Sequence, residues 1–322
     1  MPAISTSDLT KQFDEHIAVD RLNLTIEKGE IFGLLGPNGA GKTTTLMMLS
    51  TLLQPTSGTA TVNGFDVRQQ PSLVRNSIGM VFQDPSSDDV LTGYENLKLH
   101  ALMYDVPMKE IDARIDSVLA LVELQSRKND VVKKYSGGMR RRMEIARGLL
   151  HKPAVLFLDE PTLGLDPQTR EHIWEYVESL RRNFGATIIV TTHYMDEADS
   201  LCDRVAIIDH GKIVALDTPE NLRHSIGGDA VTLQGATLRV DDIRRLPFVT
   251  RVEERGGRLI LSVENARANL PEILRTAGDV AFVESHAPDL NDVFLFYTGS
   301  AIRDESGDAM NHLRDLSKIN QK

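Results

Sequence analysis

The stretch at residues 36–43 has residue types and a spacing that suit the binding of a nucleotide's phosphates. Its sequence, GPNGAGKT, fits the pattern G-x-x-x-x-G-K-[ST]. In that pattern backbone N–H groups surround the phosphates, the lysine reaches the β- and γ-phosphates, and the hydroxyl binds Mg²⁺. Lys42 and Thr43 take these two roles here. The alternative is a chance glycine-rich turn, and the flanking residues decide between the two interpretations.

These flanking residues have the pattern that a phosphate loop needs. Residues 30–35 form a short apolar run typical of a buried strand, and residues 43–53 carry apolar side chains at roughly helical spacing. A strand, a glycine-rich turn and a helix together direct N–H groups and the positive end of the helix at phosphates. The setting therefore favours a phosphate loop over a chance turn.

Two acidic residues, Asp159 and Glu160, directly follow the apolar run at residues 155–158. Carboxylates just past the end of a buried parallel strand lie where α/β sheets bind ligands. Asp159 suits Mg²⁺ coordination, and Glu160 suits the polarisation of an attacking water. A further predicted strand, residues 187–192, places His193 at the same edge. Ordinary exposed acids are the alternative, and the apolar run leading into them favours a functional site.

A predicted helix begins after Ser136, which is a good N-cap residue. Gly137 and Gly138 in its first turn disfavour the helix by about 1 kcal/mol each relative to alanine. An anion that approaches the helix start closely accounts for that cost. The arginines at residues 140–142 are interpreted as a solvated face of the helix in preference to an anion clamp.

Length and composition set the broad class of the protein. The 322 residues suit about two domains, and 41% hydrophobic residues are enough for a sizeable core. The net charge of −10, without a long basic stripe, argues against a nucleic-acid partner. The single cysteine, Cys202, excludes an internal disulfide framework and suits a reducing compartment. We find no signal peptide, and no run of the roughly 18–20 apolar residues that span a bilayer, so any membrane part must come from another polypeptide.

The order of predicted elements divides the chain. Two hairpin strands occupy residues 4–24, with Phe13 in the turn between them, and a strand at residues 78–82 leads to Gln83. From there to about residue 150, apolar residues recur three or four positions apart, which predicts helices. Beyond a glycine pair at residues 227–228, strands and short helices suggest a βαββαβ-like module. Residues 301–322 are polar and expected to be frayed.

In this order and spacing, the motifs resemble the nucleotide-binding subunit of an ABC transporter over about residues 3–225. The resemblance implies an α/β fold with a P-loop NTPase core, an antiparallel β subdomain and a helical insertion. It gives an ATP-binding domain at residues 1–225 with its helical subdomain at about 84–150. The order of predicted elements adds a small C-terminal α/β module at 226–300 and a flexible tail at 301–322. The cofactors implied are ATP and Mg²⁺.

The family's functional positions transfer residue by residue. Those that bind the nucleotide are Phe13, Gly36, Pro37, Asn38, Gly39, Ala40, Gly41, Lys42, Thr43, Thr44, Ser136, Gly137, Gly138 and Asp166. Those that bind the metal are Thr43, Gln83 and Asp159. Those implied in catalysis are Glu160 as general base, with His193, Lys42 and Gln83.

A narrower resemblance is to the drug-export branch typified by daunorubicin/doxorubicin-resistance ATPases. Residues 31–36, 91–97 and 135–142 carry it, with a shorter match at 290–294 and 298–299. One departure from the general Leu-Ser-Gly-Gly-Gln signature is that Tyr135 and Met139 stand at its ends. Met139 cannot make the polar nucleotide contact of a glutamine. The branch tolerates this form, so the departure does not imply an inactive enzyme.

The resemblance implies a dimer, with a second copy or a paralogue, that holds two ATP molecules between the subunits. A separate polytopic membrane permease is the implied partner, and the chain is expected in the cytoplasm, peripheral on the inner face of the cell membrane. Export of a drug-like or other hydrophobic substrate is the main hypothesis. Import, or the work of a soluble ABC ATPase on DNA or ribosomes, are the alternatives. A P-loop kinase or GTPase would not explain the signature helix.

Overall fold

The computed structural model describes residues 1–255 and 257–298. The chain divides into two compact units. The first contains Met1–His193 and Ala206–Val214, and the second contains Tyr194–Val205 together with the described residues from Ala215 on. The predicted frayed tail and Gly299 lie outside the described residues. None of the helices in the described ranges is both long enough and apolar enough to cross a bilayer.

An antiparallel sheet of order β2-β1-β4-β5 forms one part of the first unit. Its strands are β1 (Ile4–Phe13), β2 (His16–Ile26), β4 (Ser57–Val62) and β5 (Phe65–Asp66). A turn at Asn63-Gly64 joins β4 to β5, and both residues have positive φ, at 51° and 84°. Positive φ at both central residues is the requirement of a tight hairpin turn, which explains the Asn-Gly pair.

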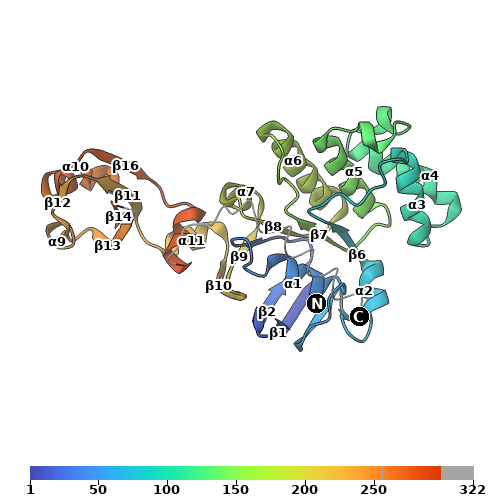
Figure 1. Ribbon diagram of the computed structural model, residues 1–322, viewed down its shortest axis with the longest axis horizontal. Helices are drawn as coiled ribbons and strands as arrows, with labels where there is room; N and C mark the ends of the chain where they lie inside the picture. Colours follow the sequence, from blue (N-terminus) through green and yellow to red (C-terminus); the bar gives the residue numbers. More distant parts are fainter. Residues whose placement is uncertain (256, 299–322) are drawn as a thin grey trace. The chain divides into compact units, whose positions relative to one another are not determined.

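The second sheet has the order β10-β9-β3-β8-β7-β6, and Figure 1 labels β6, β7 and β8 next to one another. Its strands are β3 (Ile31–Leu35), β6 (Ile78–Val81), β7 (Val155–Asp159), β8 (Thr187–Thr192), β9 (Arg204–Asp209) and β10 (Lys212–Asp217). The four strands β3, β8, β7 and β6 pair in parallel. All residues of β3, β7 and β8 are buried, which is why these segments are largely apolar.

Parallel pairing brings the carboxyl ends of these four strands to one edge. The segments that follow them are the phosphate loop after β3, His193 after β8, Glu160 after β7 and Gln83 shortly after β6. This arrangement is the ligand-binding edge of an α/β sheet. The sheet therefore gathers residues that lie up to about 150 positions apart in sequence.

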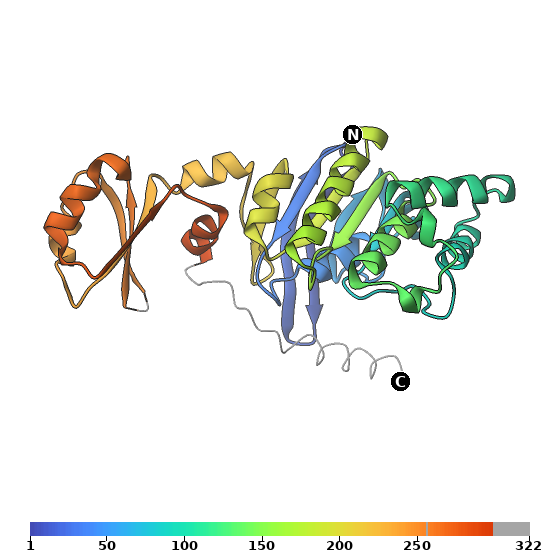
Figure 2. The same cartoon turned by 90° about the horizontal axis from the view of Figure 1, so that it is seen from above.

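Helices occupy the stretches between the strands. They are α1 (Lys42–Leu49), α2 (Pro71–Ser77), α3 (Gly93–Met103), α4 (Met108–Leu121), α5 (Gly137–Leu149) and α6 (Pro167–Phe184). Helices α3, α4 and α5 contact one another, and Figure 2 shows them as one group in teal to green. Thr92 and Glu95 form a capping box that fixes the start of α3. The predicted helical insertion is therefore present, whereas α2 was not predicted.

The second unit contains α7 (Met195–Leu201) and α8 (Pro219–Ser225), and then the C-terminal module. The elements of this module are β11 (Asp229–Gln234), β12 (Thr237–Leu238), α9 (Val240–Ile243), β13 (Val249–Arg255), β14 (Arg258–Val263), α10 (Ala266–Ala277), β15 (Gly278–Asp279), β16 (Phe282–His286) and α11 (Leu290–Thr298). The main sheet has the order β13-β14-β11-β16. Along the chain, the strands of this sheet and the helices α9 and α10 follow one another in the order βαββαβ, which confirms the predicted module. Apolar residues of β11, β14 and α10 lie in its core.

Candidate nucleotide site

The phosphate loop joins β3 to α1, and its lysine is folded back onto the loop. Lys42 Nζ donates to the carbonyl oxygens of Gly36 at 2.7 Å and of Pro37 at 3.2 Å. The side chain is only 5% exposed, and burial, as the largest influence, lowers the pKa of Lys42. The ammonium group therefore points into the loop whose N–H groups are predicted to bind phosphates.

Gly41, just before α1, must be a glycine for two reasons. Its φ of +106° is a conformation that residues with a Cβ rarely adopt. A Cβ at this position would also lie 2.5 Å from the carbonyl oxygen of Ala18 in β2. The turn into α1 therefore depends on the close approach of β2 as well as on the backbone path around a phosphate.

Asp159 and Thr43 present two hard oxygen ligands side by side. Thr43 Oγ1 donates to Asp159 Oδ1 at 3.3 Å, and Thr191 Oγ1 donates to the same oxygen at 2.5 Å. Burial, as the largest influence, raises the pKa of Asp159. A hydroxyl and a carboxylate at the end of a phosphate loop suit Mg²⁺, which prefers oxygen ligands. These residues fit the implied metal, and bound Mg²⁺ would also offset the cost of burying the carboxylate.

The carboxylate of Glu160 lies between two cationic or protonatable groups. Its Oε1 is 3.4 Å from Lys42 Nζ, and its Oε2 is 3.2 Å from His193 Nδ1. Burial is the largest influence and raises the pKa of Glu160, but the hydrogen bond from His193 and the charge of Lys42 outweigh it. The pKa of Glu160 is therefore lowered. Glu160 is 8% exposed, and a carboxylate kept ionised there can accept a proton from water.

Gln83 and Phe13 are less closely tied to this cluster. Gln83 follows β6 at the same edge and is exposed, and its carbonyl oxygen lies 3.5 Å from Arg141 Nη1. Phe13, predicted in a turn, is the last residue of β1, where Lys11 Nζ lies 4.9 Å from its ring centroid. Roles for Gln83 in metal binding and for Phe13 in adenine stacking stay predictions.

Ser136, at the start of the signature motif, and Asp166 each cap the helix that follows them. Ser136 caps α5 by accepting a hydrogen bond from the Met139 N–H at 3.3 Å, as predicted. Asp166 caps α6 through Thr169, whose N–H and Oγ1 donate to its two carboxylate oxygens at 3.0 and 2.6 Å. Ser136, Gly137 and Asp166 are all exposed. Their position leaves them available to another molecule, as a nucleotide sandwich would require.

Gly138 has an explanation within one chain that the sequence did not suggest. A Cβ on Gly138 would lie 2.6 Å from Cγ2 of Thr169, which Asp166 holds in place, whereas a Cβ on Gly137 would meet only Leu165 at 4.0 Å. Packing of α5 against the start of α6 therefore accounts for Gly138. An approaching anion is needed only to explain Gly137.

The predicted solvated face at residues 140–142 is wrong for Arg141. Arg140 and Arg142 are partly exposed, and they pair with Asp89 and Glu123. Arg141 is only 6% exposed, and its hydrogen bonds go to backbone carbonyls. The signal for this difference is helical spacing, because Arg141 lies four residues before the buried Ile145 and so shares its face.

Sequence reasoning also missed Thr191, the fifth residue of β8. Its hydroxyl donates to Asp159 Oδ1 and accepts from the N–H of Glu160 at 2.9 Å. Thr191 therefore joins the two acidic residues. The polar pair Thr191-Thr192 at the end of an otherwise apolar strand was the available signal.

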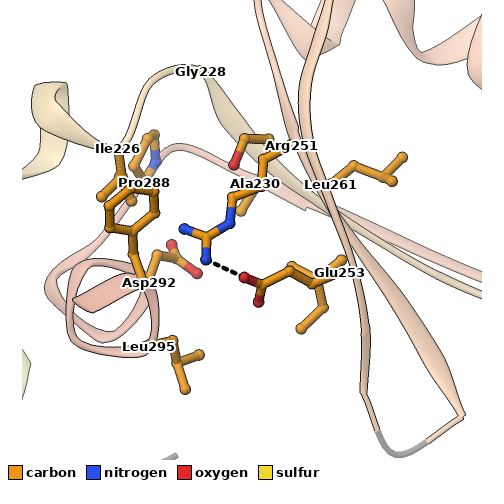
Figure 3. A pocket seen from close by; sticks show the side chains of 12 residues that line it. Ile226, Gly228, Ala230, Arg251, Glu253, Leu261, Pro288, Asp292 and Leu295 are labelled. Carbon is orange, nitrogen blue, oxygen red and sulfur yellow. Dashed lines mark ion pairs between the residues drawn. The ribbon is translucent and has the colours of Figure 1, made fainter. Parts of the chain in front are cut away.

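The C-terminal module contains a separate small pocket between its sheet and α11 (Figure 3). Arg251 points into it, forms an ion pair with Glu253, and lies 4.1 Å from the ring centroid of Phe296. Asp292 at the pocket's edge has a raised pKa, chiefly because it is partly buried. The charged residues of the pocket, Arg251, Glu253 and Asp292, are thus already paired within the module, Asp292 with His286.

Comparisons with known proteins agree with this architecture. The family model described as ABC transporter matches residues 19–163, and the one described as ATP-binding protein DrrA1-3-like, C-terminal domain, matches residues 218–298. A third, AAA domain, putative AbiEii toxin, Type IV TA system, matches residues 135–195. The two larger matches correspond to the predicted nucleotide-binding core and C-terminal module.

Relatives of known name are similar over nearly the whole chain. The daunorubicin resistance ATP-binding protein DrrA2 of Streptomyces coeruleorubidus is 39% identical over 92% of this chain and 95% of its own length. The Nod factor export ATP-binding protein I of Cupriavidus metallidurans is 40% identical over 92% and 97%. The linearmycin resistance ATP-binding protein LnrL of Bacillus subtilis is 35% identical over 94% and 100%.

Solved structures of ABC cassettes have the same fold. The cbiO1 protein of Clostridium perfringens, part of an ABC transporter complex, is 30% identical with a TM-score of 0.65 over 69% of this chain and 90% of its own. The dimeric bacterial ABC transporter cassette MJ0796 is 28% identical with a TM-score of 0.62 over 67% and 98%. The chain therefore belongs to the ABC transporter family, as one of its ATP-binding and ATP-hydrolysing subunits.

Proposed function

We propose that the chain energises export of a drug-like or other hydrophobic compound through a separate membrane permease, by hydrolysing ATP at the edge formed by β3, β8, β7 and β6. The observation that carries the proposal is the position of the Glu160 carboxylate between Lys42 Nζ at 3.4 Å and His193 Nδ1 at 3.2 Å. A general base beside the lysine of a phosphate loop is placed to activate water next to a γ-phosphate.

The proposed reaction uses groups that the chain already holds close together. The N–H groups of the loop and the start of α1 bind the phosphates, and Lys42 exchanges its contacts with Gly36 and Pro37 for phosphate oxygens. Thr43, Asp159 and Gln83 would hold Mg²⁺, which neutralises charge on the β- and γ-phosphates. Glu160 accepts a proton from the attacking water while His193 keeps its carboxylate oriented.

A second cassette completes the site in this proposal. Ser136 and Gly137, exposed at the start of α5, would cover the γ-phosphate of an ATP held by the other subunit. The comparison cassette MJ0796 is described as dimeric, including a state bound to ADP and Pi, which supports such a pair. The partner is a second copy of this chain or a paralogue.

Exposed apolar side chains in the helical insertion support a membrane partner. Leu99, Leu102 and Met103 on α3 and Met108 at the start of α4 are all exposed large hydrophobics. Gathered apolar side chains on a water-facing surface are typical of interaction sites. Binding there would keep the chain on the cytoplasmic face of the membrane.

Export is tested in cells that produce the chain together with the polytopic membrane protein that co-purifies with it. The names of the relatives suggest doxorubicin, whose fluorescence reports its concentration, as the probe. Cells with the wild-type pair should accumulate less doxorubicin than cells with the Glu160→Gln pair. Equal accumulation would contradict drug export, and greater accumulation with the wild type would indicate import. Co-purification with nucleic acid or ribosomes instead of a membrane protein would favour a soluble ABC ATPase.

A further inference from the structure

The backbone of Glu160 adopts a conformation that its surroundings must enforce. Its φ is +44°, in the left-handed region that residues with a Cβ seldom occupy. On one side, its N–H donates to Thr191 Oγ1 at 2.9 Å and lies 3.2 Å from the Thr191 carbonyl oxygen. These contacts fix the amide of Glu160, but they leave the flanking peptide carbonyls to be held by another group.

That other group is the guanidinium of Arg141. Arg141 Nη2 donates to the Asp159 carbonyl oxygen at 2.9 Å, and Nε donates to the Pro161 carbonyl oxygen at 2.6 Å. The two carbonyls belong to the residues immediately before and after Glu160. The planar fork of an arginine can bridge two such acceptors, which a lysine ammonium, as a point charge, cannot do equally well. Arg141 therefore clamps the turn on which Glu160 stands.

The same guanidinium reaches the segment that contains Gln83. Arg141 Nη1 donates to the Phe82 carbonyl oxygen and lies 3.5 Å from that of Gln83. A single buried side chain thus joins the end of β6 to the end of β7. Burial of an arginine is costly unless its donors are satisfied, and here Nε, Nη1 and Nη2 all donate to backbone carbonyls at the nucleotide edge.

A second anchor on α5 holds the residues that follow Gln83. Glu144 is 1% exposed, and its Oε1 accepts from the N–H groups of Ser86 at 3.2 Å and Ser87 at 2.8 Å. Its other oxygen accepts from Ser86 Oγ at 3.0 Å and pairs with Arg147 at 2.7 Å. Glu144 lies three residues after Arg141, on the same face of α5. The helix therefore holds residues 82–87 at two points.

We propose that Arg141 is a positioning residue for ATP hydrolysis, which holds Glu160 in its reactive backbone conformation and couples it to Gln83 and to the signature helix. The inference rests on the proposed role of Glu160 as general base. It adds that α5 carries two functions on two faces. Its exposed N-terminus meets the nucleotide held by the second cassette. Its buried face fixes the position of the catalytic carboxylate in its own cassette. A shift of α5 on dimer formation is thereby transmitted to Glu160 through one side chain.

The test compares Arg141→Met with Arg140→Met in the full-length chain assembled with its membrane subunit. Both changes remove a guanidinium from the same helix, but Arg140 pairs with Asp89 and touches neither Glu160 nor Gln83. Arg141→Met is expected to lower kcat for ATP hydrolysis about 10- to 100-fold. The Kd for Mg-ATP, measured by displacement of a fluorescent ATP analogue, should change less than threefold because the phosphate loop is untouched. Arg140→Met should stay within threefold of wild type in both quantities.

Arg141→Lys covers the case in which the methionine variant fails to fold, because it keeps a donor in the buried site. Its kcat should be intermediate, with Kd for Mg-ATP again unchanged, and this split between kcat and binding is not expected of a residue that only supports packing. Two results together would overturn the inference. The first is a kcat of Arg141→Lys within twofold of wild type, and the second is a kcat of folded Arg141→Met within threefold of wild type. Parallel loss of binding and turnover would also overturn it.

Glu160→Gln, measured alongside, separates this inference from the proposed function. If Glu160→Gln turns over ATP normally, the general base has been misassigned and the inference falls with it. If Glu160→Gln is inactive while the Arg141 variants are as active as wild type, only the positioning role is wrong.

Discussion

Lys42 Nζ lies 3.4 Å from Glu160 Oε1, and both residues are more than nine-tenths buried, at 5% and 8% exposure. One residue opens the helix after β3, and the other follows β7, so the contact forms only when both strands take their places in the sheet. Each charge compensates the burial of the other. A phosphate group that contacts Lys42 must therefore compete with Glu160 for its ammonium.

Lys42→Ala should weaken ATP binding itself. The variant loses a charge-assisted contact with the phosphates, an interaction of about 1.5–3 kcal/mol, so the Kd for Mg-ATP should rise roughly 10- to 100-fold. Titration calorimetry of the full-length chain measures this directly. An unchanged Kd would show that Lys42 does not contact the phosphates.

Glu160→Gln should leave ATP bound but unhydrolysed. Loss of a general base lowers kcat by about 10²–10⁴-fold, and the variant should accumulate as an ATP-bound dimer in size-exclusion chromatography with light scattering. Glu171→Gln on the exposed face of α6 is the matched control and should hydrolyse ATP as wild type does. Turnover by Glu160→Gln within threefold of wild type would refute the assignment.

Thr191→Val should damage both stability and turnover. It removes the hydroxyl that serves Asp159 and the Glu160 N–H, so a loss of about 1–3 kcal/mol in unfolding free energy is expected. Thr187→Val is the control, because Thr187 is a buried threonine of the same strand whose hydroxyl accepts instead from the Gly29 N–H at 3.0 Å. Urea unfolding should show similar losses for the two variants. Only Thr191→Val should also lower kcat, and equal kcat values would show that Thr191 has no part in the site.

Gly138→Ala tests whether packing within one chain dictates this glycine. The added Cβ would collide with Thr169 Cγ2, so the unfolding free energy should fall by about 1–3 kcal/mol. Thr169→Ser removes Cγ2 but keeps the hydroxyl that donates to Asp166, and the double variant should regain most of the stability. No recovery in the double variant would mean that another contact requires Gly138.

His100 should make stability depend on pH. Burial, followed by the charges of Arg147 and His151, lowers the pKa of His100 to about 3. Between that value and the ordinary 6.5, the unfolded chain binds a proton that the folded chain does not, so stability falls as pH falls through this window. The slope reaches about 1.4 kcal/mol per pH unit for one proton. The difference between wild type and His100→Leu isolates this part of the curve, and parallel curves would show that His100 does not contribute.

The sequence was sufficient to predict the parallel edge, because its signals are local. Apolar runs that end abruptly in the loop at residue 36, in Asp159 and in His193 can be recognised without knowledge of the fold. Parallel pairing then brings these three points together, as the structure shows. The βαββαβ order of the C-terminal module was predictable for the same reason.

What could not be predicted depends on what packs against a residue. Arg141 shares a helix face with the buried Ile145, but only the approach of residues 82–83 and 159–161 determines which groups its guanidinium contacts. From sequence alone, Gly138 suggests an anion site, whereas in the structure the packing of Thr169 of α6 against it explains the glycine. In both cases the decisive partner lies on another element, and no pattern within the helix itself identifies that partner.

The parallel strand order has a consequence for synthesis on the ribosome. Since β3 pairs with β8 and β9, which both come later in the chain, it has no partner strand in its own sheet until the chain has been made past Thr192. Translation proceeds from the N-terminus, so an emerging polypeptide that already displays the loop would still lack Glu160 and His193. Nucleotide can therefore act as a folding ligand only late, once more than half of the chain has left the exit tunnel.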